Sequence, residues 1–263
     1  VLFTQGVNIL LNLFFGPAVN AARGIAVQVQ GAVTQFSTNF QTAINPQITK
    51  SYAVGDYAYM HSLIFHSSKF TFLLLATISF PVLLETEMIL QLWLETVPNY
   101  TAVFVRLMLC TTIIDAMAGA FMVSAQATGA VRVYQSVVGG ILLTIVPVSY
   151  IVLKMGAEPW SVFIVHLCVC ILAFAVRLFI LCRMIHLSLS GYFTKVLLRC
   201  MGVLIIALPL PLILLYFLSD TFINSIMVCL SGLLAMLFSS YVIGLVSNER
   251  KFIKDKILLF LKL

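Results

Sequence analysis

Long apolar segments with no charged residue dominate this sequence. The segments 70–84, 203–218 and 226–246 approach or reach the roughly 20 residues that an α-helix needs to cross a bilayer. Soluble domains usually contain about 25% charged residues. This chain of 263 residues has 9% charged and 62% apolar residues, with a mean hydropathy of +1.10. A water-facing surface cannot be built from this inventory, so we predict an all-α integral membrane protein packed as one bundle.

Turn signals divide the chain into about eight transmembrane helices. Gly16 with Pro17, Asn45 with Pro46, Pro98 with Asn99, Gly129, and the segment 156–159 are typical of breaks between helices. We expect spans at about residues 1–15 (a truncated span), 18–45, 62–84, 101–127, 133–153, 160–183, 197–218 and 222–247. The chain starts in an apolar segment with no charged region before it, which is unlike a signal peptide. We therefore expect a missing upstream portion.

The basic residues are distributed unevenly between the two sides that these spans define. If the spans alternate from a cytoplasmic start, one side holds only Arg23 and Lys154 together with acidic residues. The cytoplasmic side then holds Lys50, Lys69, Arg132, Arg183, Lys195, Arg199, Arg250, Lys251, Lys254, Lys256 and Lys262. Basic residues concentrate on the cytoplasmic side of membrane proteins. The pattern therefore predicts that both ends of this multi-pass chain are cytoplasmic.

Two further segments have the composition of helices that lie on a membrane surface. The segment 85–98 combines acidic residues with apolar ones, and we expect a short helix on the outer face. The tail 248–263 combines basic and apolar residues, which predicts an amphipathic cytoplasmic helix suited to anionic inner-leaflet lipids. The net charge of +6 does not indicate nucleic-acid binding, because the basic residues lie in short loops and in the tail.

The segment 18–45 differs from the other spans because polar side chains follow one face of it. If it is a helix, this face is about 37 Å long, the depth of a membrane. One ridge contains Asn20, Arg23, Gln30, Thr34, Ser37, Gln41 and Asn45, and the adjacent ridge contains Gln28, Gly31, Gln35, Thr38 and Thr42.

Such a face cannot contact lipid, because unsatisfied amides in hydrocarbon cost several kcal/mol each. Two interpretations stay open. The polar groups form hydrogen bonds between helices, worth about 0.6 kcal/mol per contact, or they line a wet cavity. We favour the cavity because packing needs only one or two polar residues per helix. The amides also suit hydroxyl-rich ligands such as sugars.

Three ionisable residues other than histidine lie within the later spans, namely Arg106, Asp115 and Arg177. Charges embedded in lipid usually face a partner or a cavity. Arg106 and Asp115 are about 13 Å apart along one helix and are not a simple pair. Asp115 is expected to have a functional role or a role in a polar network. Arg177 either faces the cavity or extends toward the cytoplasmic interface.

No catalytic or metal-binding pattern is visible in the sequence. The four histidines are not clustered at metal-ligand spacing, and Cys168 and Cys170 lie on different faces of a helix. We find no Ser-His-Asp set and no glycine-rich phosphate loop. We therefore expect neither an enzyme nor a cofactor.

The segments 6–17, 20–26 and 45–52 resemble polysaccharide-export flippases of the multidrug/oligosaccharidyl-lipid/polysaccharide (MATE-like) superfamily. Such flippases have two six-helix lobes around a V-shaped cavity, often followed by two more helices. The resemblance implies that 1–185 is the C-terminal six-helix lobe, that 186–247 contains the two appended helices, and that 248–263 is the tail. It also implies that an N-terminal lobe of the same transporter is missing from this chain.

The resemblance implies a function in the bacterial inner membrane. Flippases of this kind move undecaprenyl-pyrophosphate-linked oligosaccharides across the membrane by alternating access, for surface polysaccharide biosynthesis. Arg23, Arg106 and Arg177 become the cationic candidates for the pyrophosphate. Coupling to H⁺ or Na⁺ stays open, as do three alternatives: a cation-coupled multidrug exporter, a membrane-embedded glycan polymerase, and a fragment that does not transport.

Overall fold

The chain folds into a bundle of helices, and within the described residues it contains no strand. The computed structural model describes residues 2–218, 221–247, 249–251 and 254. The elements are α1 (Leu2–Phe15), α2 (Pro17–Val54), α3 (Tyr57–Leu84), α4 (Thr86–Trp93), α5 (Thr101–Met117), α6 (Gly119–Ala127), α7 (Val131–Leu143), α8 (Ile145–Lys154), α9 (Ser161–Ile185), α10 (Leu189–Tyr192), η1 (Phe193–Leu197), α11 (Leu198–Ala207), α12 (Pro209–Phe217), α13 (Phe222–Ser239) and η2 (Ser240–Gly244). Two short segments, η1 between α10 and α11 and η2 after α13, are π-helical.

Several of these elements join into helices long and apolar enough to cross a membrane. Among the described residues there are six such stretches, Tyr57–Leu84, Thr101–Ala127, Val131–Lys154, Ser161–Ile185, Leu189–Phe217 and Phe222–Gly244. A shorter apolar helix covers Phe3–Phe15, and α2 is helical but more polar. The predicted class of an all-α multi-pass membrane protein is therefore confirmed.

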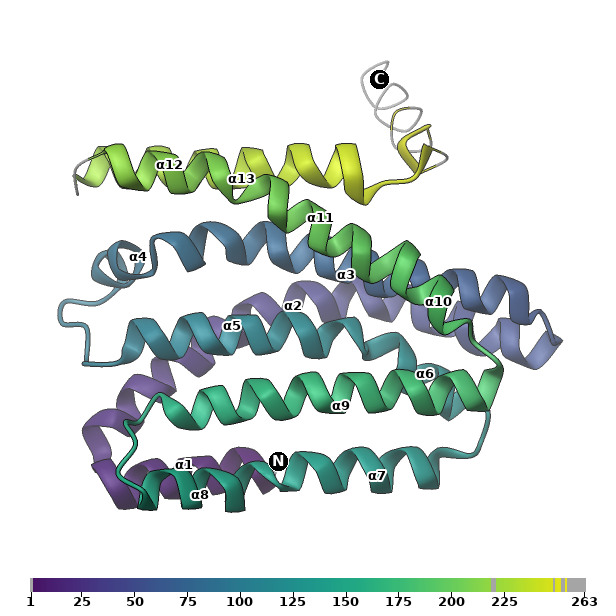
Figure 1. The fold of residues 1–263 in the computed structure, drawn as a ribbon, viewed down its shortest axis with the longest axis horizontal. Coiled ribbons are helices and arrows are strands. Elements are labelled where there is room, and N and C mark those ends of the chain that lie inside the picture. Colours follow the sequence, from purple (N-terminus) through teal and green to yellow (C-terminus); the bar gives the residue numbers. More distant parts are fainter. Residues whose placement is uncertain (1, 219–220, 248, 252–253, 255–263) are drawn as a thin grey trace.

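The junctions between helices gather at the two ends of the bundle (Figure 1). The α2–α3, α6–α7 and α9–α10 junctions lie at one end, and the α1–α2 and α8–α9 junctions lie at the other. The short α4 confirms a helix within 85–98. The amphipathic helix expected over 248–263 falls mostly outside the described residues, which there are only 249–251 and 254.

The predicted break at Asn45 and Pro46 is wrong, because α2 continues through Pro46 to Val54. A proline inside a helix removes one hydrogen bond and can kink the helix without ending it. Packing retains the last turns, since Ile48 and Ser51 are buried. The helix ends instead at Gly55, whose φ of 82° is left-handed, and the Asp56 side chain accepts a hydrogen bond from the Tyr59 N–H at 3.0 Å to start α3.

The last helices lie along the outer side of α3 (Figure 1). Glycines permit this close packing. A Cβ on Gly232 of α13 would lie 2.9 Å from Leu84, and one on Gly244 would lie 3.0 Å from Leu73. The helices expected as an appended pair are therefore attached to the rest of the bundle mainly through α3.

The end of α2 gives the first testable prediction. Gly55→Ala places a side chain in the left-handed region, which costs about 1–2 kcal/mol, so we expect a lower melting temperature. Pro46→Ala restores a backbone donor inside the helix, so we expect an equal or higher melting temperature. Thermal unfolding of the purified protein in detergent measures both variants. A lower melting temperature for Pro46→Ala with no change for Gly55→Ala would contradict the continuous helix.

Candidate functional site

The two polar ridges of α2 face different surroundings. The ridge with Arg23, Gln30 and Gln41 is partly buried, and its Ser37 is only 3% exposed. The other ridge is exposed on the described chain and contains Gln28, Gly31, Gln35, Thr38 and Thr42. Among these, Thr38 and Thr42 use their hydroxyls within α2, where they donate to the carbonyls of Thr34 and Thr38. The stripe predicted from the sequence is therefore present, with one ridge turned toward the bundle.

A cavity of about 440 Å³ lies beside the inner ridge. This volume is within the roughly 300–1,000 Å³ of ligand pockets. Side chains of α1, α5 and α9 complete the wall opposite α2. From the residues predicted for the site, the cavity brings together Arg23, Gln30, Thr34, Thr38, Gln41 and Asp115.

Two glutamines of α2 connect the cavity wall to the helices opposite. The Gln30 Nε2 donates to the Thr112 hydroxyl at 2.8 Å, and the Gln41 Nε2 donates to the Ala116 carbonyl at 2.8 Å. The second contact needs Gly119, because a Cβ there would overlap the Gln41 amide. Both glutamines thus have a structural contact and also line the cavity.

Asp115 forms an ion pair with Arg177 across α5 and α9. Arg177 Nη1 lies 2.5 Å from Asp115 Oδ1. The Arg177 side chain is 13% exposed and the Asp115 side chain is 57% exposed. Arg177 therefore lies behind Asp115, and the carboxylate is the member of the pair that lines the cavity. The interpretation that Arg177 extends toward the interface is replaced by this pairing.

Arg23 and His166 line the cavity near α1. The Arg23 guanidinium donates to the Thr4 carbonyl at 3.1 Å and to the Asn8 side-chain oxygen at 3.4 Å. Neither partner is charged, so neither contact supplies a counter-charge for the guanidinium. The His166 ring packs against Phe3 with 5.4 Å between the ring centroids.

The remaining predicted residues lie outside the cavity lining. Arg106 donates to the Thr86 hydroxyl at 3.1 Å and lies 3.6 Å from a Glu87 carboxylate oxygen, at the α3–α4 end of α5. Gln28 and Gln35 are on the exposed ridge of α2. Asn20 and Asn45 are partly buried, and the side-chain oxygen of each is buried without a hydrogen bond in the structure.

Sequence reasoning missed His166, Thr112 and Gly119 as parts of the site. The signal for His166 was available, because His166, Cys170 and Arg177 share one face of a helix at spacings of four and seven residues. Thr112 similarly precedes Asp115 by three residues on α5. Gly119 had no such signal, because its role depends on the approach of a distant glutamine.

The cavity combines a guanidinium that forms no ion pair among the described residues, an exposed carboxylate, and several amides and hydroxyls. This set can bind a ligand that is both anionic and rich in hydroxyl groups. Within the described residues, no group of three or more His, Cys, Asp or Glu side chains could hold a metal ion. No protein-family model, no curated protein and no solved structure matches this chain.

The contact between Gln41 and Gly119 can be tested by a compensating pair of substitutions. Gly119→Ala forces the Gln41 amide away from the Ala116 carbonyl, so we expect a lower melting temperature in detergent. Gln41→Ala removes the overlapping atoms, so the double variant should recover part of the loss. A double variant that is less stable than Gly119→Ala would contradict this packing.

The ion pair between Asp115 and Arg177 can be tested by a double-mutant cycle. Asp115→Asn and Arg177→Gln should each lower the unfolding free energy, because each leaves the remaining charged residue without its counter-charge. The double variant should lose less than the sum, with a coupling of roughly 0.5–3 kcal/mol, as is typical of contacting residues. Unfolding in detergent by a chemical denaturant measures the cycle. Additive losses would show that the pair does not form.

Proposed function

We propose that this chain is the C-terminal portion of a transporter that moves a lipid-linked oligosaccharide across a bacterial inner membrane, and that it is not an enzyme. The observation that supports this function is the cavity itself. It places Arg23, which forms no ion pair with any described residue, in one wall with the amides of Gln30 and Gln41. A pyrophosphate needs such a cation, and sugar hydroxyls need such amides.

In this proposal the chain crosses the membrane eight times with both ends in the cytoplasm. The six long apolar stretches supply six crossings. The apolar α1 and the polar α2 supply the other two, since α2 packs against α1, α3 and α5 and exposes apolar residues such as Val27 and Phe36 beside its polar outer ridge. The end of the bundle with the α2–α3, α6–α7 and α9–α10 junctions is then cytoplasmic, because it holds Lys50, Arg132 and Arg183.

The exposed ridge of α2 indicates where a second lobe would lie. Its amides cannot face hydrocarbon, and the described chain provides no helix that covers them. A second lobe opposite this ridge would enclose a water-filled cleft between the two lobes. Rocking of the lobes would then expose Arg23 and the amides alternately to each side of the membrane.

A cation-coupled exporter is the second candidate, and one observation favours it. The Asp115 carboxylate is 57% exposed and faces a cavity that also contains His166. Embedded carboxylates and histidines are the groups that bind protons or Na⁺ in transporters. Such coupling is also compatible with export of a lipid-linked oligosaccharide.

Complementation of a flippase-deficient bacterial strain tests the role of Arg23. The full-length gene containing this sequence is expressed with Arg23→Ala, which removes the free cation from the cavity. A charged hydrogen bond is worth about 1.5–3 kcal/mol, so surface polysaccharide synthesis should fall about tenfold or more. Polysaccharide is measured on gels and protein in the membrane by immunoblot.

Arg106→Ala is the matched control, since it removes the same charge outside the cavity. We expect this variant to keep at least half of the surface polysaccharide at equal protein levels. Normal polysaccharide in Arg23→Ala, or an equal loss in both variants, would remove the proposed role of Arg23. Normal polysaccharide in Arg23→Ala together with loss in Asp115→Asn would favour the cation-coupled exporter.

A further inference from the structure

A second cavity, of about 500 Å³, lies between α3, the α10–α11 region and the segment that follows η2. Its position is at one end of the spans, because Ser188 belongs to the link between α9 and α10 and Glu249 follows η2. Its polar lining is mostly basic and includes His61, His66, Lys69, Lys195 and Arg199. We call it the basic pocket. It shares no lining residue with the cavity beside α2.

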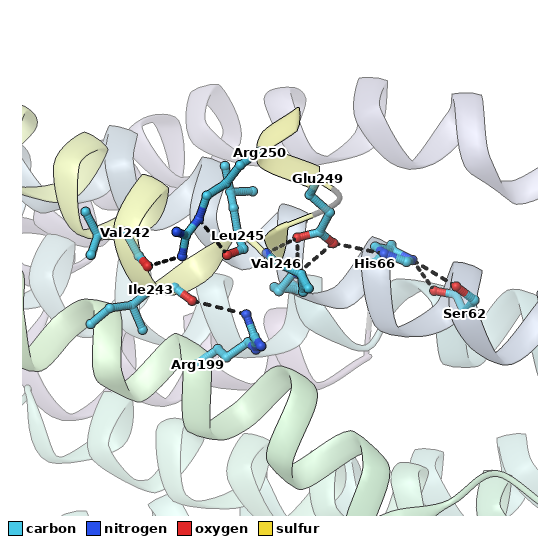
Figure 2. Close-up of polar contacts among 10 residues, drawn as sticks. Ser62, His66, Arg199, Val242, Ile243, Leu245, Val246, Glu249 and Arg250 are labelled. Atoms are coloured by element: carbon cyan, nitrogen blue, oxygen red, sulfur yellow. Dashed lines mark hydrogen bonds and ion pairs between the residues drawn. The ribbon is translucent and has the colours of Figure 1, made fainter. Parts of the chain in front are cut away.

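The chain itself places one anion in the basic pocket, the carboxylate of Glu249. Lys69 Nζ donates to both carboxylate oxygens, at 2.7 and 2.6 Å, and His66 Nε2 lies 2.9 Å from one of them. The Val246 N–H donates to the other oxygen at 2.7 Å. Figure 2 shows Glu249 pointing toward His66 from the segment that follows η2. The pocket is therefore already built to hold an oxyanion.

The Glu249 carboxyl is ionised throughout the physiological range. Burial by itself raises its pKa, but hydrogen bonds from His66, Lys69 and the Val246 N–H outweigh burial and lower the pKa to about 2. Because the folded pKa is below the unfolded value, this contact stabilises the folded chain at neutral pH. The stabilisation is fully present above the unfolded pKa of 4.5 and is lost as the pH falls from there through about 2.

One carboxylate does not neutralise the basic pocket. The Glu249 carboxylate forms its ion pair with Lys69, whose side chain is 4% exposed. Within the described part of the chain, Arg199 donates to the Ile243 carbonyl, at 3.4 Å (Figure 2), and the Lys195 ammonium lies 6.0 Å from the centre of the Phe65 ring. Among the described acidic residues none forms an ion pair with Lys195 or Arg199. Two positive charges four residues apart thus remain available in the pocket.

We propose that the basic pocket binds the phosphate of an anionic headgroup through Lys195 and Arg199, beside the carboxylate of Glu249. Phosphate oxygens accept charge-assisted hydrogen bonds from guanidinium and ammonium groups. Basic pockets between membrane helices are suited to lipid headgroups at the membrane surface. A lipid phosphate and a soluble phosphate have the same chemistry here. Glu249 repels either one and so limits the affinity.

Binding to the purified full chain in a neutral detergent tests this proposal. The probes are dioctanoyl phosphatidylglycerol, dioctanoyl phosphatidylcholine and inorganic phosphate, and the shift in melting temperature during titration gives the affinity. We expect phosphatidylglycerol to bind and phosphatidylcholine to bind at least tenfold more weakly. Competition by inorganic phosphate at millimolar concentration would identify a phosphate site open to soluble ions. Lack of competition would identify a lipid site.

Two double variants with the same change in charge separate the pocket from the general surface. Lys195→Gln with Arg199→Gln should weaken phosphatidylglycerol binding at least tenfold. Lys50→Gln with Arg132→Gln neutralises two basic residues outside the pocket and should change binding less than twofold. If the first double variant does not fold, Lys195→Gln alone replaces it, because this substitution removes only the contact with the Phe65 ring. It should weaken phosphatidylglycerol binding about threefold or more.

Glu249→Gln should change the affinity in the opposite direction, because it removes the competing negative charge while keeping an acceptor for Lys69. We expect tighter phosphatidylglycerol binding by severalfold. Equal losses in the two double variants, equal affinity for the two lipids, or no response to phosphatidylglycerol or phosphate would each overturn the proposal. These outcomes are independent of polysaccharide export.

Discussion

The polar face of α2 is the constraint on which the rest of the bundle depends, because hydrocarbon offers no partner for its amides. The bundle itself supplies hydrogen-bond partners for one of the two polar ridges of α2. The inner ridge packs against α5 and α6, where Gln30 reaches Thr112 and Gln41 reaches the Ala116 carbonyl. The outer ridge, with Gln28 and Gln35, is left exposed by the described chain. The same helix therefore stabilises the bundle on one side and requires a polar environment on its other side.

Two ion pairs in this protein join helices that are far apart in the sequence, whereas other basic residues line cavities without an ion pair among the described residues. Asp115 of α5 pairs with Arg177 of α9, and Lys69 of α3 pairs with Glu249 after η2. Among the described residues, Arg23, Lys195 and Arg199 line cavities without forming an ion pair. A positive charge without a counter-charge in such a setting is costly. Both cavities are therefore suited to anions.

Much of the fold could be predicted from the sequence, because hydrophobic length and helical periodicity are local properties. The polar ridges of α2 followed from spacing alone, and the break at Gly16 followed from Gly and Pro chemistry. The break predicted at Pro46 was wrong because buried residues beyond it keep the chain helical to Val54. The pairs of Asp115 with Arg177 and of Lys69 with Glu249 could not be predicted, since they join residues 62 and 180 positions apart. Contacts of that range depend on how helices cross, which periodicity does not determine.

Side chains from α2 and α3 hold the break between α5 and α6. Helical hydrogen bonding is interrupted around Ala118. Side chains from two helices donate to the carbonyls next to it: Gln41 of α2 to Ala116 at 2.8 Å, and the buried Ser68 of α3 to Met117 at 2.7 Å. Lys69, the next residue along α3, holds the segment after η2 through Glu249. Displacing α2 alone would break such contacts in a low-dielectric interior, where an unpaired polar group is costly. Rotation of the whole bundle keeps all of them, so the alternating access that we propose requires rocking of the bundle as one body.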